Sequence, residues 1–456
     1  MKDNSLLKNS VYNVLYKCLN VIFPLVTSIY ASRVLQADGI GIVASAQNIV
    51  LYFTTIASLG IPTYGIKKIA ESRDNKSELT KTFLELFTIN LFSSVICSVI
   101  YYSMIIELTY FFSQRILYIV CGLNIVFNII NVDWFYQGIE EYRYIMFRSM
   151  VIKLLSLVLL FILVRGKQDY VYYAFISSLA LVLNYCFNIL YIRKIISIKK
   201  FKLNVWQHIK PVFILLGAVI AVEIYTLADT TMLTMLCDES TVGLYSNSMK
   251  MIKIVRSLIV AICAVFLPRL SYYYSKGKTK QFNELIDNGL KILFTLTLPA
   301  ALGLILISDV LIPTMFGTSF LGAVITTKIL SISIITVAFS NFLGYQVLVT
   351  VGREKQMMYS TIFGAAINVV LNAILIKVYQ QNGAALASVA TEAGVMFFQI
   401  VCVRNLVSVH FNKTFVSSII IGLIAMGMCV VFIKGNISNP LINMVLSVAI
   451  GGGVYL

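Results

Sequence analysis

Three basic residues recur at every third position in an otherwise apolar stretch of the chain. Lys250, Lys253 and Arg256 lie in the segment 244–268. At 100° per residue in a helix, their side chains fall within an arc of about 120°. A charged side chain inside a membrane-spanning helix costs about 3 kcal/mol, so such residues are rare and mark function. The spacing therefore predicts a basic stripe that holds an anion in an aqueous cavity.

Two acidic residues precede this stripe and could neutralise part of it. In a hairpin of two spans, Asp229 and Lys250 lie at one depth, and Glu223 and Arg256 lie at another. One interpretation is two ion pairs that fix the register of the hairpin. The other assigns the cations to substrate binding and the acids to coupling. Lys253 favours the second interpretation, because it has no acid at its level and its stem is too short to reach either interface.

Three further ionisable residues are candidates with competing interpretations. Asp133 ends the fourth apolar segment beside Trp134, which is interpreted as an interfacial anchor. Glu392 either couples transport to protons or sodium or bonds a neighbouring helix. Arg33, at the outer end of the first segment, is interpreted as an interfacial charge, with substrate binding as the alternative.

The elements that must position these residues are membrane-spanning helices. The 456 residues are 59% hydrophobic and only 12% charged, and a soluble chain would carry roughly twice that charged fraction. Apolar runs of about 20 residues, each able to cross the hydrocarbon core, follow one another along the chain. The predicted fold is an all-α membrane protein with about fourteen transmembrane helices, over 12–32, 40–60, 83–106, 116–136, 150–164, 170–192, 211–236, 244–268, 292–308, 323–350, 359–378, 384–403, 414–433 and 440–456.

The start of the chain is polar and leads into a full-length span, which argues against a cleaved signal peptide. The last apolar run reaches Leu456 without a closing basic residue, so we expect the natural chain to continue.

The net charge of +16 orients the chain and does not indicate a nucleic-acid partner. With a cytoplasmic N-terminus and alternating spans, the cytoplasmic segments and the span ends next to them hold 26 of the 36 Lys and Arg residues. This bias is the one expected of a multispanning inner-membrane protein.

Enzyme and metal chemistry find little support in the sequence. The eight cysteines are scattered without a CxxC pair, and the only histidines are the distant His208 and His410. No phosphate-binding GxxxxGK[ST] loop is present, and no outer connection is long enough to carry a catalytic site. We expect no metal, no cofactor and no enzymatic activity.

Short matches at about half the chain length indicate an internal repeat. Ile40-Gly41-Ile42 matches Val242-Gly243-Leu244, and Gly138-Ile139-Glu140 matches Gly352-Arg353-Glu354. Six spans separate the copies, so both halves have the same orientation and form two parallel lobes with a site between them. The predicted domains are a six-helix lobe over 1–200, a second over 201–410, and two additional helices over 411–456.

Several motifs are similar to signatures of the bacterial polysaccharide-transport family and follow one another in the order and spacing of that family. The matching residues are Arg33-Val34-Leu35 with Gly39-Ile40-Gly41, Asp133-Trp134-Phe135-Tyr136-Gln137-Gly138-Ile139-Glu140, Asp229 with Val242-Gly243-Leu244-Tyr245, and Asn368 and Asn372 with Gly383-Ala384-Ala385-Leu386-Ala387 and Glu392. Gln36-Ala37-Asp38 departs from the family, which often has a glycine after the leucine.

This resemblance implies a multidrug-extrusion-like fold and a flippase that works by alternating access. Its substrate would be undecaprenyl-pyrophosphate-linked oligosaccharide repeat units of O-antigen or another surface polysaccharide. Its expected partners are this lipid-linked glycan and the bilayer, with a polysaccharide polymerase and a chain-length regulator as further candidates.

Two alternatives compete with the flippase. A cation-coupled multidrug extruder shares the fold, but a cavity for cationic drugs should be acidic, whereas the predicted stripe is basic. A membrane glycan polymerase ranks third, because it would need a large outer loop with acid or arginine clusters.

Overall fold

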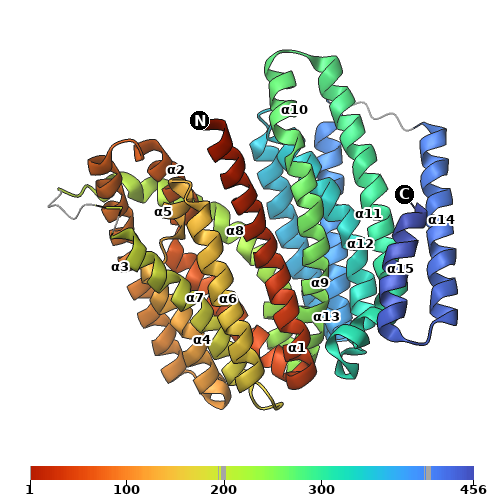
Figure 1. Ribbon diagram of the computed structural model, residues 1–456, viewed down its shortest axis with the longest axis horizontal. Coiled ribbons are helices and arrows are strands. Elements are labelled where there is room, and N and C mark those ends of the chain that lie inside the picture. The colour runs from red at the N-terminus through yellow and green to blue at the C-terminus, as the bar shows by residue number, and fades with distance from the viewer. Residues whose placement is uncertain (1, 194, 197–201, 405, 407–411, 456) are drawn as a thin grey trace. The chain divides into compact units, whose positions relative to one another are not determined.

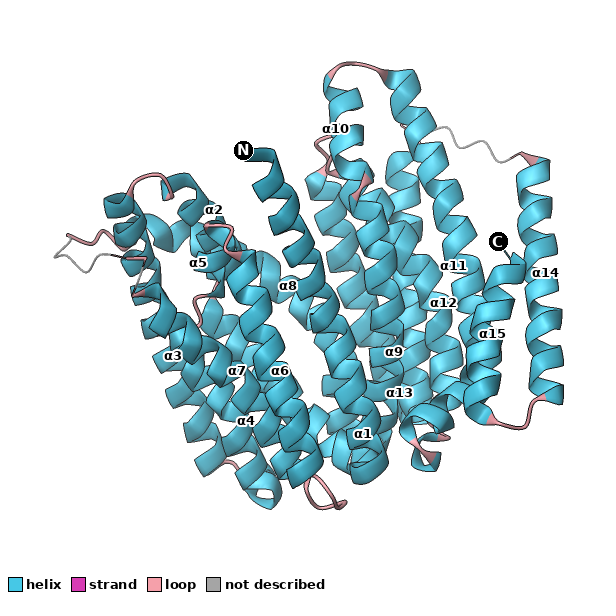
Figure 2. Cartoon of the chain, viewed as in Figure 1, coloured by secondary structure: helices cyan, strands magenta, loops and turns pink. Residues whose placement is uncertain are grey.

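The computed structural model describes residues 2–193, 195–196, 202–404, 406 and 412–455, and the regular elements of these ranges are all helical (Figure 2). The α-helices are α1 (Lys2–Ser58), α2 (Ile61–Ser72), α3 (Lys76–Glu107), α4 (Arg115–Phe127), α5 (Asp133–Gly138), α6 (Tyr142–Leu163), α7 (Tyr170–Ile192), α8 (Trp206–Leu236), α9 (Glu239–Ala264), α10 (Phe266–Ser275), α11 (Thr279–Phe316), α12 (Ala323–Asn341), α13 (Glu354–Val403), α14 (Lys413–Asn436) and α15 (Pro440–Tyr455). Three short 3₁₀ helices, η1 (Thr109–Gln114), η2 (Asn128–Ile130) and η3 (Thr318–Phe320), and one π-helix, η4 (Phe342–Leu348), connect them.

Two helices are too long to cross a membrane once. Helix α1 has 57 residues, or about 85 Å at 1.5 Å per residue, against about 30 Å of hydrocarbon. It is interrupted at Gln36, where φ is 60°. Helix α13 is interrupted in the same way at Gln380, where φ is 49°. Each therefore supplies two spans.

Among the described residues, ten helical stretches are long and apolar enough to span a membrane, and the bent α8 makes up to eleven. Counting both halves of α1 and α13, and adding the shorter apolar α15, gives the fourteen predicted segments. The predicted all-α membrane fold is confirmed.

The chain forms two compact units. The first comprises residues 1–35 and 42–224, and the second comprises 36–41 and 225–456. The predicted lobe boundaries at residues 200 and 410 lie outside the described residues and stay predictions.

Within the first unit, one core gathers side chains of α2, α3, α5 and the start of α8. Trp134 is only 3% exposed, and its ring stacks on that of Phe83 with centroids 5.8 Å apart. The expectation that Trp134 is an interfacial anchor is therefore wrong, because the indole fills the core of this unit.

Within the second unit, α12 packs between α9, α11 and α13, and α14 and α15 lie side by side against α11 (Figure 1). Asp238 caps the N-terminus of α9, where its side chain accepts a hydrogen bond from the backbone N–H of Thr241 at 2.9 Å. The hydrogen bonds from Thr241 hold the pKa of the Asp238 carboxyl below its usual value.

The two glycines of the internal repeat meet in the second unit. A Cβ on Gly41 would lie 1.7 Å from the carbonyl oxygen of Glu239, and a Cβ on Gly243 would lie 2.0 Å from that of Ala37. The backbones approach too closely for any side chain. This close packing explains why a glycine stands at the centre of both Ile40-Gly41-Ile42 and Val242-Gly243-Leu244.

Gly243→Ala is expected to destabilise the protein by about 3 kcal/mol or more, because the backbone of α1 must move to admit a methyl group. The melting temperature of the detergent-solubilised full chain measures this. Gly303→Ala on α11 is the matched control, because a Cβ there meets nothing within 4 Å. Equal melting temperatures for the two variants would contradict the close approach.

Candidate functional site

Helix α9 carries all three predicted cations. Lys250 and Arg256 are half-buried, whereas Lys253 is exposed. Lys250 Nζ donates a hydrogen bond to Asn247 Oδ1 at 3.2 Å. The sequence therefore places an exposed lysine between two partly covered cations on one helix.

Arg256 lies among groups from two other helices of the second unit. Its guanidinium interacts electrostatically with Glu392 of α13 and with Tyr225 of α8, and the hydroxyl of Tyr225 donates a hydrogen bond to Glu392. Glu392 thus links two helices, as one of its two interpretations anticipated. The predicted pair of Glu223 with Arg256 would join residues of different units and stays a prediction.

The guanidinium of Arg256 has two hydrogen-bond donors that are not used within the described part of the chain. Its Nε and Nη2 atoms are buried and have no hydrogen-bond partner within the described part of the chain. A buried donor without an acceptor costs about 1–3 kcal/mol. A guanidinium presents five donors in a planar fork that matches phosphate and carboxylate oxygens.

Asp229 lies at the centre of a buried polar cluster in the second unit. Its Oδ1 accepts hydrogen bonds from the side-chain amides of Asn368 at 2.9 Å and Asn372 at 2.6 Å. Its Oδ2 accepts from the hydroxyl of Tyr245 at 2.5 Å and from that of Ser388. All four groups donate to one carboxyl group, so Asp229 joins α8 to α9 and α13.

This cluster changes the interpretation of the motifs. Asp229, Tyr245, Asn368 and Asn372 all belong to quoted motifs, and they meet through the carboxylate of Asp229. Ser388 was missed, and no charge or spacing in the sequence distinguishes it. The salt bridges found among the described residues do not include the expected pair of Asp229 with Lys250.

In the first unit, Asp133 forms an ion pair that the sequence did not reveal. Asp133 Oδ1 lies 3.0 Å from Arg148 Nη2 and accepts a hydrogen bond from Asn188 Nδ2 at 2.6 Å. The side chain of Arg148 is 5% exposed and also donates to Asn184 and Asn188. The predicted spans 116–136 and 150–164 leave Arg148 in the connection between them, whereas α6 already begins at Tyr142 and includes Arg148.

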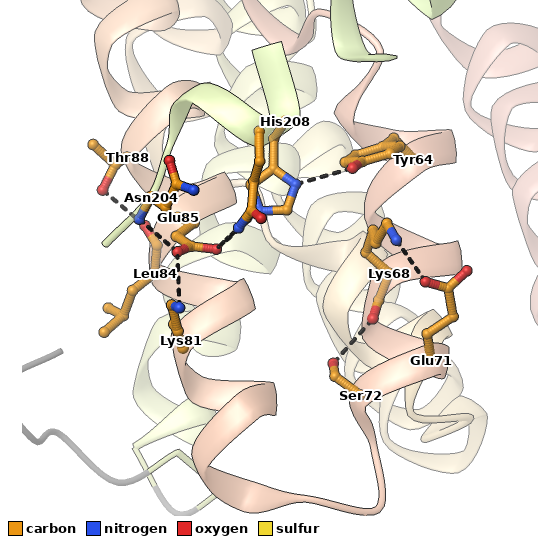
Figure 3. A network of polar contacts seen from close by, with 11 residues as sticks. Tyr64, Lys68, Glu71, Ser72, Lys81, Leu84, Glu85, Thr88, Asn204 and His208 are labelled. Atoms are coloured by element: carbon orange, nitrogen blue, oxygen red, sulfur yellow. Dashed lines mark hydrogen bonds and ion pairs between the residues drawn. The ribbon is translucent and has the colours of Figure 1, made fainter. Parts of the chain in front are cut away.

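A second missed cluster joins the start of α8 to α2 and α3 (Figure 3). Glu85 Oε2 accepts hydrogen bonds from His208 Nε2 and Gln207 Nε2, each at 2.9 Å, and His208 Nδ1 lies 2.9 Å from the hydroxyl of Tyr64. Glu85 and His208 are both buried. His208 therefore has a structural role in the first unit. His410 lies outside the described residues.

The remaining candidates also lie in the first unit. Arg33 is exposed on α1, and Glu223 is half-buried on α8. Their expected roles stay predictions.

Comparison with known proteins identifies related families. A family model described as "Polysaccharide biosynthesis protein" matches residues 6–274, and one described as "MatE" matches residues 215–374. The "Putative O-antigen transporter" of Escherichia coli K12 is 24% identical over 407 residues, which cover 88% of this chain and 97% of the relative. The "Lipid II flippase MurJ" of Bacillus subtilis is 23% identical over 57% of this chain and 52% of its own length.

Solved structures show the same fold. An inward closed lipid II flippase MurJ superposes with a TM-score of 0.76 at 14% identity, covering 97% of each chain. An inward-facing multidrug resistance MATE family transporter superposes with a TM-score of 0.66 at 14% identity, covering 84% of this chain and 94% of its own. The predicted multidrug-extrusion-like fold is confirmed.

Proposed function

Because the chain belongs to the polysaccharide biosynthesis protein family, we propose that it is a flippase for undecaprenyl-pyrophosphate-linked oligosaccharide repeat units. It would move units of O-antigen or another surface polysaccharide from the cytoplasmic to the outer leaflet of the inner membrane. Transport would proceed by alternating access without covalent chemistry, in a chain whose N-terminus is cytoplasmic. The relatives named as an O-antigen transporter and a lipid II flippase support this class of substrate.

The observation that carries the proposal is the set of cations on α9. Lys253 is exposed on an apolar spanning helix, and Arg256 has two buried N–H groups without a protein acceptor in the described residues. A pyrophosphate cannot cross about 30 Å of hydrocarbon unless fixed charges replace its hydration. Lys253 would bind the pyrophosphate first, assisted by Lys250 and Arg256, with Arg33 as a further contact.

The acids would have a different task. Asp229 and Glu392 lie in polar surroundings inside the second unit and are the proposed coupling residues. Glu392 is the more direct candidate, because Arg256 acts on it electrostatically. An anion bound to Arg256 would compete with Glu392 for the guanidinium and so link substrate binding to this acid. Asp133 and Glu223 are secondary candidates.

A cation-coupled multidrug extruder is the second candidate function. The match of residues 215–374 to the MatE model favours it. The basic stripe of α9 argues against cationic drugs as substrates, because like charges repel in a medium of low dielectric constant.

The test is lipid analysis of a strain that lacks the gene, with and without the gene supplied in trans. We expect the lipid-linked oligosaccharide to accumulate unpolymerised on the cytoplasmic side, and the gene to restore surface polysaccharide. If single units reach the outer leaflet without the gene, the proposal is wrong, and drug export should be assayed next.

A further inference from the structure

The first unit carries a surface groove between α6 and α7, and Arg148, the partner of Asp133, forms part of its lining. The groove has a volume of about 560 Å³, and its walls include Arg143, Tyr144, Phe147, Phe187 and Tyr191. The rings of Tyr144 and Tyr191 stack with centroids 4.1 Å apart and form a rigid wall at the polar end.

The groove is polar at one end and apolar at the other. Arg143 lies in the first turn of α6, and Val151 lies eight residues further, about 12 Å deeper at 1.5 Å per residue. Phe147, Val151 and Phe187 are 50%, 64% and 48% exposed. On a spanning helix, such exposed apolar side chains face lipid chains. The dimensions match a lipid with its headgroup at the end of α6 and one chain along the groove.

The charged residues at the polar end of the groove indicate which lipid headgroup would bind there. Arg148 is already neutralised by Asp133, so its charge is not available to a ligand. Glu141 and Arg143 are both exposed and have no salt-bridge partner among the residues described. One acid and one base, two residues apart, complement a headgroup with one phosphate and one ammonium.

We propose that this groove is a binding site for a phospholipid that carries a primary amine, of the phosphatidylethanolamine type. The guanidinium of Arg143 binds the phosphate, and the carboxylate of Glu141 accepts hydrogen bonds from the ammonium. The phenyl rings of Phe147 and Phe187 contact the acyl chain. The site is separate from the cations of α9 and does not depend on the transported substrate.

Tryptophan quenching by brominated lipids tests the site in the full chain. Phe187→Trp is reconstituted in phosphatidylcholine vesicles that contain a fixed fraction of brominated phosphatidylethanolamine, phosphatidylglycerol or phosphatidylcholine. The signal of the parent chain, which has two tryptophans, is subtracted. Phe397→Trp on α13 is the matched control, since Phe397 is 67% exposed and lies six residues from the end of its helix.

We expect phosphatidylethanolamine to quench Phe187→Trp about two- to fivefold more strongly than either other lipid, with no such preference at Phe397→Trp. Adding Glu141→Gln should remove the preference over phosphatidylglycerol, and adding Arg143→Gln should remove the enhancement altogether. Equal quenching by the three lipids, strongest quenching by phosphatidylglycerol, or a preference that survives both substitutions would overturn the proposal.

Discussion

Lys253→Gln is expected to reduce display of surface polysaccharide about tenfold to a hundredfold while leaving the amount of folded protein unchanged. The reason is the loss of one charge-assisted hydrogen bond to the substrate, worth about 1.5–3 kcal/mol. Folding should be spared because Lys253 is exposed on α9. The measurement is surface polysaccharide per molecule of membrane-inserted protein in a strain that lacks the gene.

Two further variants make this test specific. Lys278→Gln applies the same chemical change before the start of α11, outside the candidate spans, and should have no effect. Lys253→Arg keeps the charge and should retain most of the display. Full display by Lys253→Gln would contradict the role of Lys253 in substrate binding.

Asp229→Ala is expected to destabilise the second unit by at least about 3 kcal/mol and to abolish transport. The substitution removes the acceptor of four hydrogen bonds, from Asn368, Asn372, Tyr245 and Ser388. Each buried donor left without an acceptor costs about 1–3 kcal/mol before the cluster relaxes. The melting temperature of the solubilised chain should fall by several degrees.

Asp309 provides the matched control for this prediction. Asp309 is likewise an aspartate with several partners, since it forms ion pairs with Lys328 at 2.6 Å and Lys434 at 3.1 Å, but its side chain is 47% exposed. Exposed ion pairs contribute about 0–1 kcal/mol, so Asp309→Ala should barely change the melting temperature. If Asp229→Ala melts like Asp309→Ala, the buried cluster is not a stabilising element. If Asp229→Asn melts normally and still fails to transport, the charge itself serves the coupling.

The spanning helices could be predicted from the sequence because the signal is local. A span needs about 20 apolar residues and a basic flank, and both are properties of a continuous segment. Breaks inside a segment are less visible. Gln36 and Gln380, both with positive φ, are not the glycines that such a backbone favours, so nothing in their identity indicates where α1 and α13 turn.

The sequence also showed that charged groups lie inside the spans. It did not show which residues form hydrogen bonds or ion pairs with them. The sequence predicted an ion pair of Asp229 with Lys250, because the two residues lie at the same depth in a hairpin of neighbouring spans. The carboxylate instead binds Asn368, Asn372 and Ser388, which lie 139, 143 and 159 residues away. Depth gives one coordinate of a side chain, whereas a hydrogen bond also requires the right helix face and the right neighbouring helix.

Composition and periodicity alone determined that this chain is a multispanning membrane protein with cations on α9, because hydrophobicity and helical spacing are carried by consecutive residues. Only the tertiary structure decided that Trp134 fills a core and that Arg148 is buried against Asp133. It also decided that Gly41 and Gly243 admit a close backbone approach. The physical reason is that packing joins residues far apart in the chain, and the energy of a buried contact depends on every group that surrounds it.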